Sequence, residues 1–286
     1  MESPSCTLLV ASYDGGEDLW EGFFTALTVQ WPEFDLPVVL NTESKSYSFP
    51  GLDIKTFGLY PDRVPPWGER MRETLKRIDS EYVLLMLDDF WLNAPVDDAF
   101  FRKCLRIMQE NPDVAVLTFD TVSHPTPNSN IRDGRFPRFE RRPQRCAYRL
   151  TCGLNLWRRK RLIKFIQPHE SPWEFETLGS IRSGRYRDGF YSLIEGAAPV
   201  FSYNLGWIIV QGKWHKETVE PLRIQYGLSI DYSRRGFYES PPAPPVEKKL
   251  TLLERLRMPN LPLRIKNRLH RELLLLLSYL PEIRKE

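Results

Sequence analysis

Two glycine-rich signatures that hold nucleotide phosphates are missing from this sequence. The first predicted turn between a strand and a helix lacks the pattern G-x-G-x-x-G, and the pattern G-x-x-x-x-G-K-[ST] occurs nowhere in the 286 residues. Both patterns place a phosphate against backbone amides at the start of a helix. Their absence disfavours a dinucleotide-binding fold and a P-loop. A bound phosphate would therefore have to be held by side chains and a metal ion.

Cysteine and long apolar runs are also scarce. The four cysteines show no C-x-x-C spacing. No stretch approaches the ~18 uninterrupted apolar residues that a membrane-spanning helix needs. The first residues lack the basic and then apolar pattern of a secretory signal. We therefore expect free thiols, a reducing cytoplasmic location and no transmembrane helix.

Charge is distributed unevenly along the chain. The net charge of the whole sequence is +3, but residues 247–286 contain ten Lys/Arg and five Asp/Glu, which leaves 30 basic and 32 acidic residues elsewhere. The positive charge thus belongs to the final segment, and the body is not expected to bind nucleic acid. The 8 Trp, 12 Tyr and 16 Phe make the chain rich in aromatic residues, which suits a surface that handles carbohydrates or nucleotides.

Apolar runs alternate with amphipathic stretches through the first 120 residues. The runs predict strands at 7–11, 37–41, 53–57, 82–87 and 114–119. Apolar residues at helical spacing predict helices at 17–30, 67–78 and 98–110. This alternation favours an α/β fold with a mainly parallel sheet flanked by helices.

Two adjacent acids, Asp88 and Asp89, follow the apolar run at 82–87 directly. The run shows no alternation, so it predicts a strand that is buried on both faces. In open α/β sheets, ligands bind at the rim formed by the carboxyl ends of such strands. Adjacent carboxylates repel each other, and a divalent cation with a substrate phosphate on its far side would compensate them. The simpler alternative is that one or both acids cap the next turn.

The second half of the sequence has weaker periodicity. Residues 121–149 are rich in arginine and predict a long loop, whose arginines either meet a diphosphate or are simply solvated. The pattern Ser171-Pro172-x-Glu174 predicts a capping box at the start of a helix, which gives Glu174 a structural role. The cap does not explain Glu176, which is a candidate general base or a ligand of an acceptor hydroxyl.

Two features of the last eighty residues suggest further contacts. His215 follows a predicted strand at 207–210 and either binds a metal or diphosphate, with Lys213 as a neighbouring phosphate contact, or is an ordinary surface histidine. The proline-rich segment 240–246 predicts a semi-rigid linker. Beyond it, leucines combined with Lys/Arg predict helices that lie on an anionic membrane surface, pack on the body or form a dimer contact.

Taken together, these stretches resemble bacterial nucleotide-sugar glycosyltransferases of the GT-A kind, such as those of capsule, lipopolysaccharide and O-antigen synthesis. The resemblance covers about residues 5–220. It is carried by Ser12-Tyr13-Asp14 after the first strand, by the helix start at Trp67 to Arg72, by Leu87-Asp88-Asp89-Phe90 in the place of a DxD or EDD motif, and by Ser171 to Glu176.

The resemblance implies a role for each of these groups. Asp89 would bind Mn²⁺ or Mg²⁺ at the donor diphosphate, with Asp88 at the ribose or the metal shell, and His215 as a further metal ligand. Glu176 or Glu174 would deprotonate the acceptor hydroxyl in an inverting reaction. The donor nucleotide would contact Ser12, Tyr13, Asp14, Trp67, Arg70 and Lys213. The motif departs from the family pattern because Phe90 replaces the second acid of DxD and Leu87 replaces the Glu of EDD.

The expected organisation is a GT-A-like catalytic domain at 1–239, a linker at 240–246 and a basic helical tail at 247–286. Within the domain, about residues 1–120 would bind the nucleotide sugar and 121–239 the saccharide or lipid-linked acceptor. The tail would hold the enzyme on the inner face of the cytoplasmic membrane, and a homodimer is an alternative use of it. Two other functions stay open, a nucleotidyltransferase and a non-catalytic glycan-binding protein with the same fold.

Overall fold

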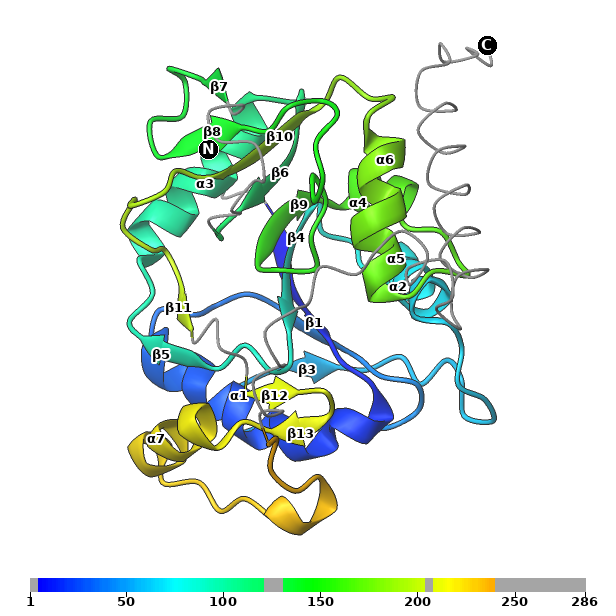
Figure 1. The fold of residues 1–286 in the computed structure, drawn as a ribbon, viewed down its shortest axis with the longest axis vertical. Helices are drawn as coiled ribbons and strands as arrows, with labels where there is room; N and C mark the ends of the chain where they lie inside the picture. Colours follow the sequence, from blue (N-terminus) through cyan, green and yellow to red (C-terminus); the bar gives the residue numbers. More distant parts are fainter. Residues whose placement is uncertain (1–4, 121–130, 204–207, 240–286) are drawn as a thin grey trace, which may run out of the picture.

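The computed structural model describes residues 5–120, 131–203 and 208–239. Its centre is a nine-stranded sheet with the order β3-β2-β1-β4-β9-β6-β10-β8-β7 (Figure 1). The strands are β1 (Cys6–Ala11), β2 (Val38–Asn41), β3 (Ile54–Lys55), β4 (Tyr82–Leu87), β6 (Val114–Thr118), β7 (Ile131–Arg132), β8 (Phe139–Arg141), β9 (Asn155–Arg158) and β10 (Gly189–Leu193).

Most of the sheet is parallel. β1 pairs in parallel with β2 and β4, β2 with β3, and β6 with β10. β1 and β4 lie near the middle of the sheet and are buried along almost their whole length, as their unbroken aliphatic sequences predict. The predicted α/β architecture with a mainly parallel sheet is therefore confirmed.

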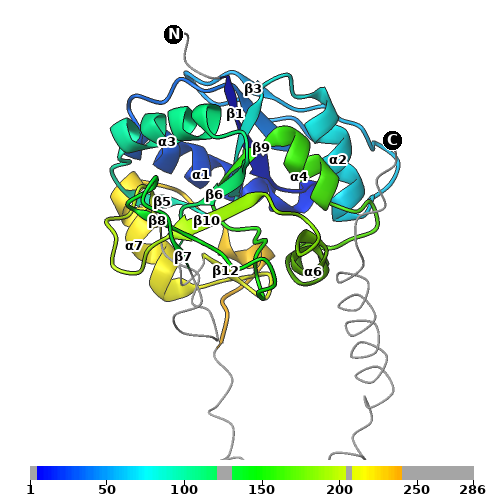
Figure 2. The same cartoon turned by 90° about the horizontal axis from the view of Figure 1, so that it is seen from above.

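Helices cover both faces of the sheet. Buried side chains of α1 (Glu17–Gln30) and α3 (Asp98–Glu110) belong to the core on one face, and those of α2 (Trp67–Arg77) and α4 (Arg159–Phe165) belong to the core on the other. Figure 2 shows these two helical layers on opposite sides of the strands. The bounds of α1 and α3 agree with the sequence prediction, because strong helical spacing coincides with acids in each first turn.

Two strands, β9 and β8, run against the other seven strands of the sheet. β9 pairs antiparallel with β4 on one side and with β6 on the other. β4 and β6 therefore run in the same direction, and their carboxyl ends reach the same edge as the amino end of β9. The sequence predicts a strand near 150–157 but contains no signal for its direction.

The arginine-rich stretch is more ordered than predicted over its described part. β8 pairs with β10, and β7 pairs with β8. Arg142 and Arg149 are buried, with exposed fractions of 1% and 2%. They are not solvated, because their Nη atoms donate to backbone carbonyls of neighbouring segments. Arg142 Nε and Nη2 and Arg149 Nε are buried without a hydrogen-bond partner, and the predicted diphosphate contact stays a prediction.

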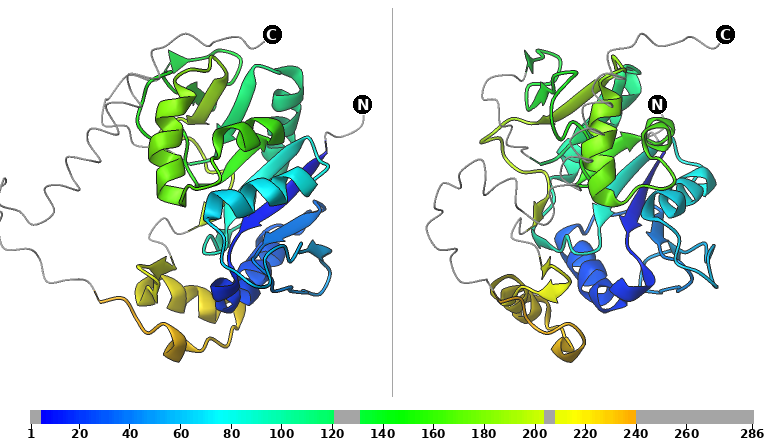
Figure 3. Two further views of the ribbon diagram at one scale, coloured as in Figure 1. Left: turned by 90° about the vertical axis from the view of Figure 1, so that its right-hand side faces the viewer. Right: turned by 45° about the vertical axis from the view of Figure 1, so that its right-hand side comes forward.

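Shorter elements complete the described chain. They are β5 (Leu92–Ala94), β11 (Ser202–Tyr203), β12 (Ile209–Val210), β13 (Lys213–Trp214), α5 (Pro172–Glu174), the π-helical turn η2 (Phe175–Gly179), α6 (Ser180–Ser183), α7 (Lys216–Tyr226) and the 3₁₀ turns η1 (Asp14–Gly16) and η3 (Tyr232–Arg234). Figure 3 shows the segment from β12 to η3 beside α1. The linker and tail predicted at 240–286 lie outside the described residues. Within the described ranges, no helix is long and apolar enough to cross a membrane.

Candidate active site

The candidate site lies along one edge of the sheet. The carboxyl ends of β1, β4 and β6 meet the amino end of β9 at this edge, as the strand registers require. Ser12 follows β1, Asp88 and Asp89 follow β4, and Asp120 comes two residues after β6. The structure thus brings the predicted Ser12 and acidic pair together, and it adds Asp120, which the sequence analysis did not select.

Asp88 is held in place by the end of β1. The Trp20 indole Nε1 donates to Ser12 Oγ at 2.7 Å, and Ser12 Oγ donates to Asp88 Oδ2 at 2.5 Å. A side chain at Gly16 would collide with the same carboxylate, since its Cβ would lie 2.5 Å from Asp88 Oδ2. Ser12 is only 5% exposed, so its clearest role is to orient Asp88.

Asp89 has a different environment from its neighbour. Its Oδ1 is buried and has no hydrogen-bond partner. Burial raises the pKa of Asp89 to about 6. Burial and the charge of Asp89 raise the pKa of Asp88 to about 7. Two carboxylates whose charged forms are this poorly compensated would gain from a bound cation.

The acidic pair suits a divalent cation that is coordinated partly by the protein and partly by a substrate. Mg²⁺ in proteins typically takes one or two carboxylates and completes its shell with substrate phosphates and water. The buried, unpartnered oxygen of Asp89 is one such ligand atom. In the described part of the chain, no group of three or more His, Cys, Asp or Glu side chains could hold a metal by itself. Phosphate oxygens and water would therefore supply the remaining ligands.

His215 is occupied locally. Its Nδ1 lies 2.7 Å from Thr218 Oγ1, and its Nε2 lies 3.5 Å from a Glu217 carboxylate oxygen, both in the first turn of α7. Among the described residues, His215 belongs to no group of three or more His, Cys, Asp or Glu side chains that could hold a metal. Lys213 is exposed in β13. The predicted metal and phosphate roles of His215 and Lys213 stay predictions.

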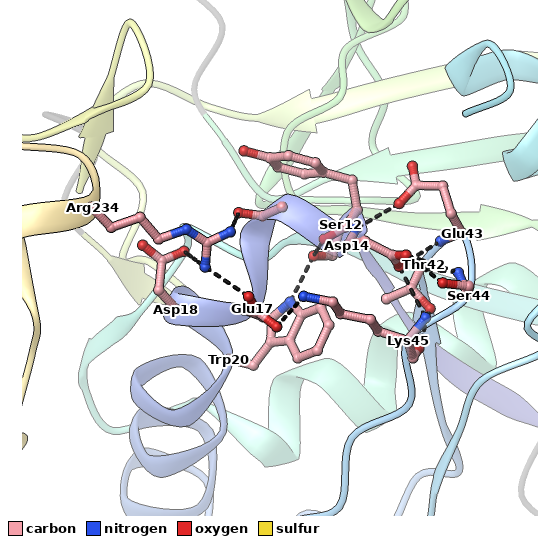
Figure 4. A network of polar contacts seen from close by, with 12 residues as sticks. Ser12, Asp14, Glu17, Asp18, Trp20, Thr42, Glu43, Ser44, Lys45 and Arg234 are labelled. Atoms are coloured by element: carbon pink, nitrogen blue, oxygen red, sulfur yellow. Dashed lines mark hydrogen bonds and ion pairs between the residues drawn. The ribbon is translucent and has the colours of Figure 1, made fainter. Parts of the chain in front are cut away.

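Asp14 ties together the segments that follow β1 and β2. Its carboxylate accepts hydrogen bonds from the backbone amides of Glu43, Ser44 and Lys45 and from Ser44 Oγ (Figure 4). Tyr13 stands beside it and is 44% exposed. Of these two predicted nucleotide contacts, Tyr13 is thus available to a ligand, whereas Asp14 shapes the loop.

Arg70 and Trp67 also make contacts within the protein. The Arg70 guanidinium forms a buried ion pair with Glu43 and donates to Ser12 O at 2.6 Å and to Asn41 Oδ1 at 3.0 Å. Burial lowers the pKa of Arg70 to about 10. The Trp67 ring packs against Phe175, with ring centroids 5.5 Å apart. Both side chains are therefore engaged in contacts within the protein, and their predicted contacts with the donor nucleotide stay predictions.

Two arginines near the end of the described chain close one side of the site. Arg234 donates to Glu17 and Arg235 to Asp18, and both donate to the backbone oxygen of Gly15. Figure 4 shows Arg234 reaching the start of α1. The charge of Arg235 partly offsets the rise that burial causes in the pKa values of Asp88 and Asp89. This pair could not be predicted from sequence, because nothing local to residues 234–235 indicates a partner more than two hundred residues away.

The two candidate bases have unlike surroundings. Glu174 completes the predicted capping box: Ser171 accepts a bond from the Glu174 amide, and the Glu174 carboxylate accepts one from the Ser171 amide. Glu176 lies in the π-helical turn η2, a form that recurs at functional sites. Glu176 Oε1 accepts from the Cys152 amide at 2.7 Å, and burial raises its pKa above the usual value. Glu176 therefore suits a proton acceptor better than Glu174.

Asp120 links the two halves of the rim. Its Oδ2 accepts from the Leu154 amide at 3.1 Å, two residues from the amide that binds Glu176. Its Oδ1 accepts from the Tyr203 hydroxyl, and the Tyr203 ring is stacked on Phe90 with centroids 4.4 Å apart. A continuous set of contacts thus runs from the acidic pair through Tyr203 and Asp120 to the stretch that holds Glu176.

No family model and no curated protein sequence matches this chain. Among solved structures it is similar to residues 1–349 of TarS from S. aureus in complex with UDP-GlcNAc, with TM-score 0.46, 14% identity, and coverage of 69% of this chain and 58% of that one. It is also similar to the galactosyltransferase LgtC in complex with donor and acceptor sugar analogues, with TM-score 0.43, 11% identity, and coverage of 77% and 95%.

A third similar structure is CMP:2-keto-3-deoxy-manno-octonic acid synthetase complexed with CTP, with TM-score 0.38, 14% identity, and coverage of 66% of this chain and 88% of that one. The chain spans 60%, 39% and 58% of the lengths of three TarS structures. At such low scores and identities these are resemblances only. The function proposed below rests on the side chains of this chain.

Proposed function

We propose that this protein is a glycosyltransferase that moves a sugar from a nucleoside-diphosphate donor to a saccharide or lipid-linked acceptor. The observation that carries the proposal is the acidic pair at the end of β4. Asp88 is oriented by Ser12 and Trp20, whereas the neighbouring Asp89 keeps a buried oxygen without a partner. Asp120 lies at the same sheet edge and accepts from the Leu154 amide, two residues from the Cys152 amide that binds Glu176.

The acidic pair would form the donor side of the site. Asp89, with Asp88 beside it, would hold Mn²⁺ or Mg²⁺, and the metal would neutralise charge on the nucleoside diphosphate as it departs. The sequence adds His215 as a further ligand, which requires its ring to leave Thr218. The exposed Tyr13 would stack on the nucleotide base, because an aromatic ring offers a flat apolar surface to a planar base.

Glu176 would form the acceptor side. As a general base it would take the proton from the acceptor hydroxyl, whose oxygen would attack the sugar carbon from the face opposite the diphosphate. The new glycosidic bond would form as the bond to the diphosphate breaks, so the configuration at the sugar carbon would be inverted. A base works best when its pKa lies nearer to the working pH than that of an ordinary glutamate. Burial moves the pKa of Glu176 in that direction, and the Cys152 amide keeps one carboxylate oxygen fixed.

Calorimetric titration of the full chain with UDP, GDP, CDP and TDP, each with and without Mn²⁺, tests this function. We expect at least one nucleoside diphosphate to bind, and to bind more tightly with Mn²⁺. Asp89→Ala should weaken the Mn²⁺-dependent binding by about tenfold or more, because it removes the free ligand oxygen. It should lower sugar transfer by a similar or larger factor.

Asp53→Ala is the matched control, since Asp53 is exposed and lies away from the β4 end. It should behave as wild type. A wild-type protein that bound no nucleoside diphosphate would refute the transferase. Turnover of nucleoside triphosphates with release of pyrophosphate would favour the nucleotidyltransferase instead. Glycan binding that is indifferent to every nucleotide would favour the non-catalytic protein.

We also propose that the enzyme acts in surface polysaccharide synthesis at the inner face of the cytoplasmic membrane. Support comes from the sequence alone, through the leucine-rich and basic composition of residues 247–286. A clustered positive charge is attracted to anionic lipids, and apolar side chains can enter the lipid interface. Contact with a second subunit is the competing use of the same segment.

A further inference from the structure

Tyr203 joins two parts of the rim that are far apart in sequence. It belongs to β11, which pairs antiparallel with β5, and Tyr203 itself is paired with Leu92. β5 begins three residues after Asp89, so the pairing places the Tyr203 ring on Phe90, with an angle of 17° between the ring planes. From this position its hydroxyl donates to Asp120 Oδ1. The acidic pair and Asp120 are therefore held in one frame.

The sheet geometry sets the distance between these acids. β4 and β6 are separated only by β9, so the ends of the two strands lie about 10 Å apart, two spacings of roughly 4.8 Å. On the other side, Asp120 and Glu176 bind amides two residues apart in the stretch from Cys152 to Leu154. Asp120 thus stands between the proposed diphosphate side and the proposed base.

Asp120 keeps the capacity to bind a ligand. Each of its oxygens accepts one hydrogen bond within the protein, from Tyr203 and from Leu154, and a carboxylate oxygen can accept a second. The residue as a whole is partly exposed. Burial raises the pKa of Asp120, while Tyr203, Leu154 and Arg142 favour its charged form. A side chain at position 153 would block it, because a Cβ on Gly153 would lie 2.3 Å from Asp120 Oδ2.

We propose that Asp120 accepts a hydrogen bond from a hydroxyl group of the transferred sugar, and that Tyr203 is a positioning residue that aims this carboxylate. The inference rests on the proposed function, since it assumes a nucleotide-sugar donor. Asp120 lies between the group that binds the diphosphate and the group that activates the acceptor, which is where the donor sugar must be. A charged hydrogen-bond acceptor, such as the Asp120 carboxylate, distinguishes a sugar that offers a hydroxyl at this point from a sugar that does not.

The test compares the nucleoside diphosphate with its sugar conjugate. Full-length wild type, Asp120→Asn and Tyr203→Phe are titrated by calorimetry, with Mn²⁺, against UDP-glucose, UDP-galactose, UDP-GlcNAc and GDP-mannose and against UDP and GDP alone. Asp120→Asn should weaken binding of the preferred nucleotide sugar by ~10-fold and leave the affinity for the free diphosphate within about twofold. Tyr203→Phe should change the same ratio in the same direction by a smaller factor, because the ring remains stacked on Phe90.

Monodeoxy analogues of the preferred sugar then identify the hydroxyl. One analogue should bind wild type ~10-fold less tightly and should show no further loss with Asp120→Asn, since the two changes remove the same contact. Tyr226→Phe is the matched control: it also removes a tyrosine hydroxyl that donates to the β5 segment, at Leu92 O, but has no contact with Asp120. It should lower the melting temperature without changing the ratio of affinities.

The outcomes separate the two proposals. If Asp120→Asn weakens free diphosphate and nucleotide sugar equally, or neither, the sugar contact is refuted while the transferase stands. The contact is likewise refuted if, for every deoxy analogue, the loss of affinity relative to the intact nucleotide sugar is as large in Asp120→Asn as in wild type. If wild type binds the diphosphates but neither binds nor transfers sugar from any of the conjugates, the transferase itself fails, and this inference fails with it.

Discussion

At the scale of single residues, two identical neighbours have different roles. Asp88 accepts a hydrogen bond from the Ser12 hydroxyl, which itself accepts one from the Trp20 indole. Asp89, in contrast, has a buried oxygen without a partner. The order of the residues explains the difference, because Asp88 directly ends β4 beside β1 and Asp89 is one step further out. We therefore assign the metal contact mainly to Asp89 and the framework of the site to Asp88.

Glu176 and Glu174 can be separated by matched substitutions. Glu176→Gln removes the proposed base and should lower kcat by about 10²-fold or more, with little change in melting temperature. Glu174→Gln keeps a side chain that can complete the capping box, so both activity and stability should be close to wild type. Steady-state transfer assays and thermal melts measure both effects. Loss of activity from Glu174→Gln alone would return the catalytic role to that residue.

Some of these residues were accessible from sequence and others were not. Asp120 follows a buried strand in the same way as Asp88, so the rule that found one could have found the other. Tyr203 gave no such signal, because its partners Phe90 and Asp120 lie 113 and 83 positions away and meet it only through the pairing of β11 with β5. Arginine burial was also unpredictable, since Arg142 depends on carbonyl groups that the fold places around it.

At the scale of elements, the spacing of apolar residues predicted the positions of the long helices. Long amphipathic stretches gave α1 and α3 with their observed ends, and the capping box marked the start of α5. The direction of β9 and the existence of β10 were missed. An apolar run has the same composition in either direction, and the sequence of β10, with Gly189, Tyr191 and Ser192 among its five residues, resembles neither simple strand pattern.

The loop after β2 should depend on a single carboxylate. Asp14→Ala removes the acceptor of three backbone amides, so we expect a loss of about 1–3 kcal/mol in the free energy of unfolding and weaker nucleotide binding. Burial opposes ionisation of Asp14, but the bonds from Ser44 and Lys45 outweigh it and lower its pKa. Its contribution is therefore complete above the unfolded pKa of about 4 and is lost as pH falls through the lower folded value.

Urea unfolding of wild type and Asp14→Ala at several pH values measures this effect. The difference in stability between them should be constant near pH 7 and should shrink at pH values below about 4. Asp62→Ala serves as a comparison, since that aspartate is exposed. A stability difference that persists undiminished at low pH would show that the carboxylate charge is not what holds the loop.

At the scale of the whole molecule, the end of the described chain returns to its beginning. Arg234 and Arg235 bind the start of α1, and α7 packs along the same helix. The β1 and β4 side of the rim is therefore assembled from the first hundred residues together with residues 234–235. The expected division near residue 120 into a nucleotide-sugar half and an acceptor half stays a prediction.

The proposed membrane role of the tail can be tested on the same scale. Deletion of residues 247–286 removes a net charge of +5 and the leucine cluster. The shortened protein should no longer sediment with liposomes that contain phosphatidylglycerol, while wild type should sediment and be released by high salt. Transfer to a water-soluble acceptor should be retained. Equal partitioning of both proteins would refute the membrane proposal, and a change from dimer to monomer on deletion would favour a dimer contact.

The antiparallel strand β9 also has a consequence for how the site comes into existence. Because β9 fills the space between β4 and β6, the two strands that carry Asp88 and Asp120 cannot lie at their final separation until residues 155–158 have been inserted. A growing chain that has reached Asp120 already contains both acids, yet the gap between them is unfilled. Synthesis must proceed past β9 before the ends of β4 and β6 can reach their final separation. It must proceed past Tyr203 before the contacts of Tyr203 with Phe90 and Asp120 can fix that separation.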